Sequence, residues 1–182
     1  VGQTDLRAYT RARAAAPLEA EPVRAIAAGA DRFDFVTLIN NANADWFASF
    51  TYHFSSSAGE TPVQEGFILP GEKKPVLHLS FEATGAVRDA TLVFDDIHWQ
   101  RMDKKAVPDY ATFAAERLRF DITDVQYSTE IAVNAARLGR VEFLVANTSA
   151  FSYWEPVFVA LLKRGDAIVG VANQNGMGAI EH

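Results

Sequence analysis

The stretch RFDFVTLINNANADWFASFTYHF at residues 32–54 decides the fold, because a similar stretch occurs a second time in the chain. Shifted by 108 positions (140 − 32 = 108), it aligns without a gap on RVEFLVANTSAFSYWEPVFVALL at residues 140–162. Five positions are identical, and one of them pairs Trp46 with Trp154. Similarity at a fixed offset predicts one supersecondary unit used twice.

Each copy has the pattern of two strands joined by a turn. Residues 33–39 are rich in β-branched and aromatic side chains, and the Asn residues at 40–43 favour a turn. Residues 46–54 then alternate strictly, which is typical of a half-buried strand. We expect Trp46 and Trp154 to fill the core between two sheets. The face predicted to be buried carries Trp46, Ala48, Phe50, Tyr52 and Phe54.

The rest of the chain consists of short apolar segments separated by turn signals, without any run of alternating helices and strands. A sequence of this kind predicts antiparallel sheets that stack as a sandwich. A short helix is expected at residues 110–116, and a solvated helix or linker at 4–16. The other expected strands are 18–28, an edge strand interrupted by Pro22, and 63–69, 77–81, 90–99, 118–123, 141–145, 154–162 and 167–172.

The predicted fold is all-β, with two tandem antiparallel β-sandwiches similar to immunoglobulin or fibronectin type III domains. We assign residues 1–17 to an N-terminal helix or linker, 18–108 to the first sandwich and 109–182 to the second. Only 28 residues follow Trp154 (182 − 154 = 28), so the second sandwich is short or incomplete, by about two strands. Because an uncovered strand edge pairs readily with another chain, self-assembly by strand addition is one expected consequence.

Composition and charge exclude several classes of function. The net charge of −6 argues against a nucleic-acid partner, since phosphates require a basic surface. The absence of cysteine removes thiol catalysis, disulfides and cysteine-based zinc sites. No apolar run approaches the roughly 20 residues that span a bilayer. The chain begins with Val1 rather than methionine, which leaves room for a signal peptide or membrane anchor before it.

Asp95-Asp96-Ile97-His98 is the one polar cluster with the composition of a metal or acid–base site. Strict alternation would put Asp96 and His98 on one face of their strand, and Ile97 with Asp95 on the other. No motif with metal-ligand spacing accompanies them, so a solvated polar patch is the favoured interpretation. We therefore predict no metal, cofactor or catalytic residue, and a metal-dependent enzyme around Asp96 and His98 is the third of three functional hypotheses.

Phe151, Tyr153 and Trp154 form an aromatic group beside the turn of the second copy. The first copy carries Asn43 and Asp45 where Phe151 and Tyr153 stand, so the aromatic character is specific to the second copy. Exposed aromatic side chains suit recognition surfaces. The second hypothesis is therefore a carbohydrate- or peptide-binding module that uses these three residues.

The stretch VEFLVANTSAFSYWEPVFVALLKRGDAIVGV at residues 141–171 resembles FxLyD-type and related immunoglobulin-like modules of bacterial surface proteins. In both, a strand ends in Asn and a small residue, and a turn, an apolar strand and a Gly-containing turn follow. The family's Tyr-Asp pair falls on Leu162-Lys163, which is a departure from its pattern. The matching positions are Asn147, Ser149, residues 157–162 and Gly165.

A second part of the resemblance lies in FILPGEKKPVLHL at residues 67–79 and in the following strand with Trp99. These look like tandem modules of uncharacterised, membrane-anchored bacterial proteins. The resemblance implies an extracytoplasmic module without catalytic residues. The first hypothesis is thus a structural or interaction protein in the periplasm or on the cell surface, which binds protein partners as a subunit or accessory of a larger assembly.

Overall fold

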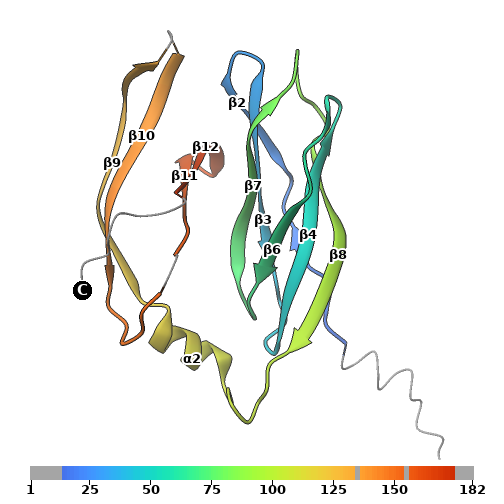
Figure 1. The fold of residues 1–182 in the computed structure, drawn as a ribbon, viewed down its shortest axis with the longest axis vertical. Coiled ribbons are helices and arrows are strands. Elements are labelled where there is room, and N and C mark those ends of the chain that lie inside the picture. Colours follow the sequence, from blue (N-terminus) through green and yellow to red (C-terminus); the bar gives the residue numbers. More distant parts are fainter. Residues whose placement is uncertain (1–13, 134–135, 154–155, 175–182) are drawn as a thin grey trace, which may run out of the picture.

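The computed structural model describes residues 14–133, 136–153 and 156–174. The described chain is mostly β-strand in several antiparallel sheets, so the prediction of an all-β fold is confirmed (Figure 1). The helix or linker predicted at 4–16 lies outside the described residues apart from its last three positions. No helix in the described ranges has the length and apolar character needed to cross a membrane.

The first sheet is built around one central strand with neighbours on both edges. Two short strands lie along one edge of the central strand, and Pro22 falls between them, as expected for a residue without an amide hydrogen. A long strand follows the other edge in antiparallel register. The central strand is β3 (Arg32–Asn40), the short strands are β1 (Glu19–Ala20) and β2 (Arg24–Gly29), and the long one is β7 (Lys73–Glu82).

The second sheet repeats this arrangement around β4 (Trp46–Ser56). A long strand pairs with one edge of β4, and two short strands pair with the other edge. The long strand is β8 (Thr91–Arg101), and the short ones are β5 (Gly59–Glu60) and β6 (Gln64–Ile68). Each central strand of this first group of strands, β1 to β8, therefore has neighbours on both sides.

The inner faces of these two sheets pack together into a dry aromatic core. Phe35 from β3 stacks on Phe54 from β4 with ring centroids 5.5 Å apart, and both side chains are fully buried. Burial of one such ring stabilises the fold by about 1.5–3 kcal/mol. The predicted alternation in β4 is confirmed from Ala48 onward. The buried core cluster consists of Phe35, Ile39, Ala48, Phe50, Tyr52, Phe54, Ile68 and Val76.

The prediction that Trp46 fills this core is wrong. Trp46 is the first residue of β4 and lies at the end of the sandwich, where its ring is only half-buried. The guanidinium carbon of Arg101 lies 5.7 Å from its ring centroid. An end position leaves part of the ring in contact with water. Trp154, the predicted counterpart, lies outside the described residues.

Strand β8 departs from the predicted strict alternation. Phe94 and Ile97 are three positions apart, yet both pack against the core. The register between β4 and β8 shifts opposite Thr51 and Tyr52, which is the mark of a β-bulge. The bulge re-aims the side chains that follow it, so Ile97 points inward with Phe94 rather than away from it.

A short helix, α2 (Tyr110–Arg117), leads to the remaining strands and confirms the helix predicted at 110–116. Asp109 caps it, because its carboxylate accepts a hydrogen bond from the Ala111 amide at 3.0 Å. The predicted domain division at residue 108 falls just before this helix, and it stays a prediction.

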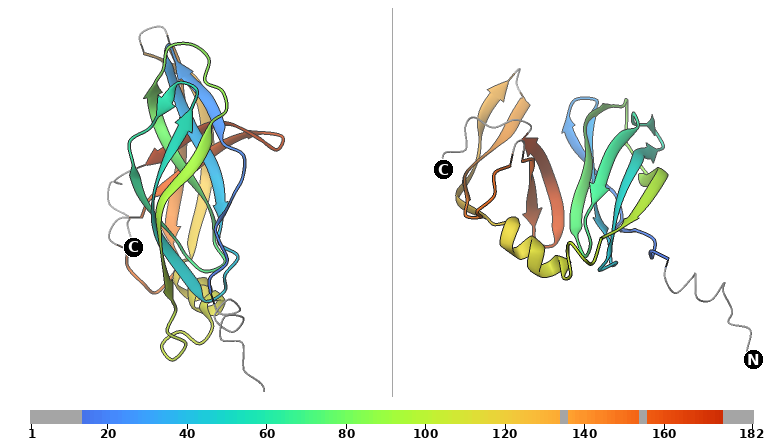
Figure 2. Two further views of the ribbon diagram at one scale, coloured as in Figure 1. Left: turned by 90° about the vertical axis from the view of Figure 1, so that its right-hand side faces the viewer. Right: turned by 60° about the horizontal axis from the view of Figure 1, so that its bottom comes forward.

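The second group of strands consists of two antiparallel hairpins, β9–β10 and β11–β12. Figures 1 and 2 both place the β11–β12 hairpin between β9–β10 and the first group. The register of the β11–β12 hairpin matches that of β4–β6 at the 108-residue offset. Phe50 pairs with Gly66 in β4–β6, and Phe158 and Gln174, each 108 positions later, pair in β11–β12. The strands are β9 (Phe120–Val133), β10 (Ala136–Asn147), β11 (Phe158–Arg164) and β12 (Ala167–Gln174).

Candidate functional site

Burial is distributed very unevenly between the two groups of strands. Among the residues whose burial the structure describes, which leaves out 130–138, every buried residue lies at or before Ala83. Of the nine exposed large apolar side chains, seven lie from Leu118 onward. A large contiguous apolar patch on a protein surface is typical of a site that another molecule covers. These seven are Leu118, Ile122, Val125, Tyr127, Leu144, Phe151 and Val157.

Strand pairing shows why the second group buries so little. In the first group, β3 and β4 each have hydrogen-bonded neighbours on both edges. In the second group, β10 pairs only with β9, and β11 pairs only with β12, among the strands that the structure describes. In the ungapped alignment β10 and β11 correspond to β3 and β4. Among the described strands, none pairs with β10 or β11 at the edge where β7 and β8 pair with β3 and β4.

Four aromatic rings form a small cluster at the two hairpins. They are Phe120, Phe143, Tyr153 and Phe158. Phe158 makes edge contacts with Phe120 at 5.8 Å and with Phe143 at 6.0 Å, measured between ring centroids. Tyr153 lies 5.3 Å from Phe120. All four rings are only half-buried. The cluster is aromatic like the core of the first group, but its rings are only partly shielded from solvent.

The first group shows what would complete such a cluster. Phe81 from β7 lies 5.4 Å from Phe35, and Phe94 from β8 meets Phe50 edge-on at 5.2 Å. The positions that correspond to Phe35 and Phe50 are Phe143 and Phe158, and among the described residues neither has a ring partner from a strand equivalent to β7 or β8. Between the hairpins there is a cavity of about 650 Å³, lined both by apolar side chains such as Phe143 and Phe158 and by charged ones such as Arg140 and Glu142.

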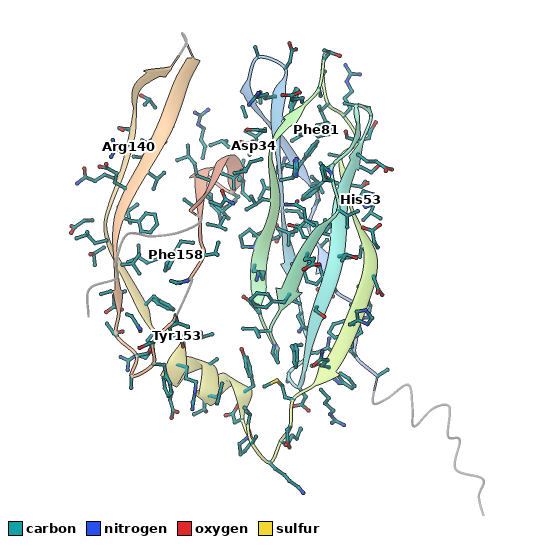
Figure 3. All side chains as sticks on the ribbon, in the orientation of Figure 1. Asp34, His53, Phe81, Arg140, Tyr153 and Phe158 are labelled. Carbon is teal, nitrogen blue, oxygen red and sulfur yellow. The ribbon has the colours of Figure 1, made fainter. Side chains whose placement is uncertain are left out.

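A second depression runs between the two groups of strands and has a volume of about 970 Å³. Residues from β6 and β7 line one side, and Tyr153 and Phe158 line the other (Figure 3). Phe67 is 55% exposed in this groove, with the Lys74 ammonium 4.0 Å from its ring centroid. The buried side-chain oxygen of Gln64 has no hydrogen-bond partner within the described part of the chain. The groove is therefore mainly apolar with a few polar groups.

Two ionisable groups beside this groove have shifted pKa values. Burial lowers the pKa of His78, although the nearby Asp34 carboxylate acts in the opposite direction. Burial also raises the pKa of Asp34, against the effect of a hydrogen bond from the Ser80 amide at 2.8 Å. A pKa of His78 below its ordinary value favours the neutral imidazole beside the groove.

Two of the three residues predicted to form a binding site are placed by the structure. The ring of Phe151 is 40% exposed and has the Arg117 guanidinium carbon 4.3 Å from its centroid. The Tyr153 hydroxyl donates a hydrogen bond to the Arg117 carbonyl at 2.7 Å. Both residues thus contact the end of α2, and only Tyr153 lines the groove. Trp154, the third residue, lies outside the described residues.

The Asp95–His98 cluster divides into two separate ion pairs. Asp96 and His98 contact each other at 2.8 Å and are both well exposed, so they do share a face. Asp95 instead pairs with His53 on the neighbouring strand β4, at 3.0 Å from Nδ1. No set of three or more metal-ligating side chains gathers among the described residues. Sequence reasoning missed the His53–Asp95 pair because only the pairing of β4 with β8 brings the two residues together.

No protein-family model, curated protein or solved structure matches this chain.

Proposed function

We propose that this chain is a non-catalytic structural or interaction protein, built from two tandem immunoglobulin-like sandwiches of which the second is incomplete. In this proposal the second sandwich binds a protein partner that donates an extended strand. The resemblance to bacterial surface modules supports a place in the periplasm or on the cell surface, within a larger assembly.

The observation that supports this function best is the contrast between equivalent central strands. β3 and β4 are covered on both edges and surround a buried core, whereas β10 and β11 each have one neighbour among the described strands and carry half-buried aromatic rings. Leaving such rings partly in water forfeits hydrophobic stabilisation that a further strand would recover. An added strand would supply main-chain hydrogen bonds to the uncovered strand edge and apolar side chains to cover the half-buried rings.

The first group also indicates the chemistry of the donated strand at β11. There, β8 runs antiparallel to β4 and directs its large apolar side chains inward, with Phe94 against Phe50. A strand beside β11 would therefore place an aromatic side chain against Phe158. Its inward positions would be apolar and its outward positions polar.

A peptide with the sequence of β8, Thr91–Arg101, tests this proposal on the full chain. We expect the peptide to bind, and we expect Phe94→Asp in the peptide to weaken binding by at least about tenfold, because a charge would face the aromatic cluster. Isothermal titration measures the affinity, and amide hydrogen exchange locates the site. Protection should appear in β11. Equal affinity of both peptides, or protection confined to the first group, would refute strand acceptance at β11.

A carbohydrate- or short-peptide-binding module is the second candidate, and the position of Tyr153 in the apolar groove favours it. Here Tyr153→Ala should abolish binding to a glycan array or peptide library, because it removes an aromatic platform. Ser56→Ala, a substitution at the end of β4 in the first group, is the matched control and should bind normally. Loss of binding in both variants, or in neither, excludes Tyr153 as the recognition residue.

A further inference from the structure

We propose that the partner at the free edge of β10 is a second copy of this chain, paired antiparallel to β10 about a twofold axis through Val141. This inference rests on the proposed function and names one partner for it. It concerns β10, whereas the donated strand described above concerns β11. The two edges are separate, so each proposal has its own test.

The free edge of β10 is suited to strand pairing. β10 has twelve residues, and no strand other than β9 is bonded to it in the described part of the chain. On its inner face Val141, Phe143 and Val145 are half-buried, while Leu144 on the opposite face is 61% exposed. A long strand that has an uncovered edge and an apolar inner face is a template for pairing with another strand.

Symmetry restricts the registers in which β10 pairs with its own copy. If the two-stranded sheets join into one continuous sheet, the twofold axis is perpendicular to the sheet, and one residue must face its own copy across the axis. At the centre of the strand that residue is Val141, Glu142 or Phe143. Each choice brings different side chains opposite one another.

Charge complementarity selects the register centred on Val141. In this register Arg140 of each copy lies directly opposite Glu142 of the other, so two opposite-charge pairs form across the interface. Centring on Glu142 would bring two carboxylates together, and centring on Phe143 would leave both charges opposite aliphatic side chains. Directly opposed unlike charges stabilise an antiparallel pair, and like charges destabilise it.

The two charged groups are available for this role. Arg140, labelled in Figure 3, and Glu142 lie two positions apart on β10 and contact each other. Both side chains are more than half exposed. Within one chain they contact only each other among the described ion pairs. The first group uses a similar pair where its central strand is covered, because Arg32 on β3 faces Glu82 on β7 at 3.2 Å.

Charge reversal with rescue tests the dimer on the full chain. Sedimentation velocity at protein concentrations up to about 200 µM should show a monomer–dimer equilibrium, and R140E or E142R should each weaken it at least about tenfold. The double variant R140E/E142R restores both ion pairs, so it should dimerise like the wild type. R32E alters an equally exposed pair in the first group and should leave the equilibrium unchanged.

A cysteine placed on the axis tests the register, since the chain has no cysteine of its own. In V141C the two sulfurs should form an intermolecular disulfide on mild oxidation, because directly opposite Cβ atoms are about 5 Å apart. In L144C the two thiols would be about 20 Å apart along the strands and should stay reduced.

Three outcomes would overturn the inference. They are a wild-type chain that stays monomeric, a double variant that does not recover dimerisation, and cross-linking that is stronger in L144C than in V141C. If the β8 peptide still binds while any of these is observed, the proposed strand-accepting function stands and only the identity of the partner at β10 is wrong.

Discussion

Replacing Phe35 with alanine should lower the free energy of unfolding by about 3–5 kcal/mol, the usual cost of deleting a large buried ring. Phe35 is fully buried and contacts both Phe54 and Phe81. The corresponding substitution Phe143→Ala should cost only about 1 kcal/mol in the monomer, since Phe143 is half-buried and has one described ring partner, Phe158.

Urea denaturation of the dilute monomer measures both values, and R140E provides a background in which dimerisation is suppressed. Because the two groups of strands are expected to unfold separately, the transition of each group is followed by its own probe. The comparison is informative because the two phenylalanines occupy equivalent positions in the ungapped alignment. Equal losses of stability from Phe35→Ala and Phe143→Ala would mean that the second group has a complete core.

Asn41→Ala should lower the free energy of unfolding by about 2–4 kcal/mol, because two partly buried carbonyl groups would lose their donor. The Asn41 side chain is fully buried and donates to the carbonyls of Trp46 at 2.7 Å and Leu69 at 2.9 Å. Its oxygen accepts from the Asn43 amide at 3.1 Å. One side chain thus ties the end of β3 to the start of β4 and to the turn after β6.

Asn147 also bonds the main chain of the turn that follows its strand, β10, but its partners all lie within four residues of it. Its oxygen accepts from the Ser149 amide at 3.0 Å, and its nitrogen donates to the Phe151 carbonyl at 2.6 Å. Asn147→Ala should therefore cost less than about 1 kcal/mol, since water replaces the lost bonds at this more exposed site. Thermal unfolding of both variants checks the difference, and a larger effect at Asn147 would contradict this interpretation.

Regular periodicity explains which parts of the fold the sequence predicts well. The alternation of β4 is strict because one sheet face meets the core and the other meets polar surroundings. The split edge at Pro22 was predictable because proline lacks the amide hydrogen that a strand ladder needs. The helix at 110–116 was also predicted, and Asp109 immediately before it has the identity expected of a cap.

Features that depend on long-range pairing were not predictable from local patterns. The bulge in β8 reverses the face on which Ile97 lies, and it is defined only by the register against β4. Trp46 was expected inside the core because large rings favour such positions, but its place at the strand end leaves it half-buried. The Arg140–Glu142 ion pair belongs to no recognisable sequence motif. Its position beside an uncovered strand edge follows only from the pairing of β10, which has β9 as its single neighbour among the described strands.

Amide hydrogen exchange on the dilute, monomeric R140E chain tests the central claim most directly, because it compares the two groups of strands in one molecule. With β10 and β11 each covered on one side, their amides should exchange by local opening, at least about a hundredfold faster than those of β3 and β4. Adding the β8 peptide should slow exchange in β11. If β10 and β11 exchange as slowly as β3 and β4 without any partner, the second group is complete by itself, and the claim that it requires a strand from another chain is wrong.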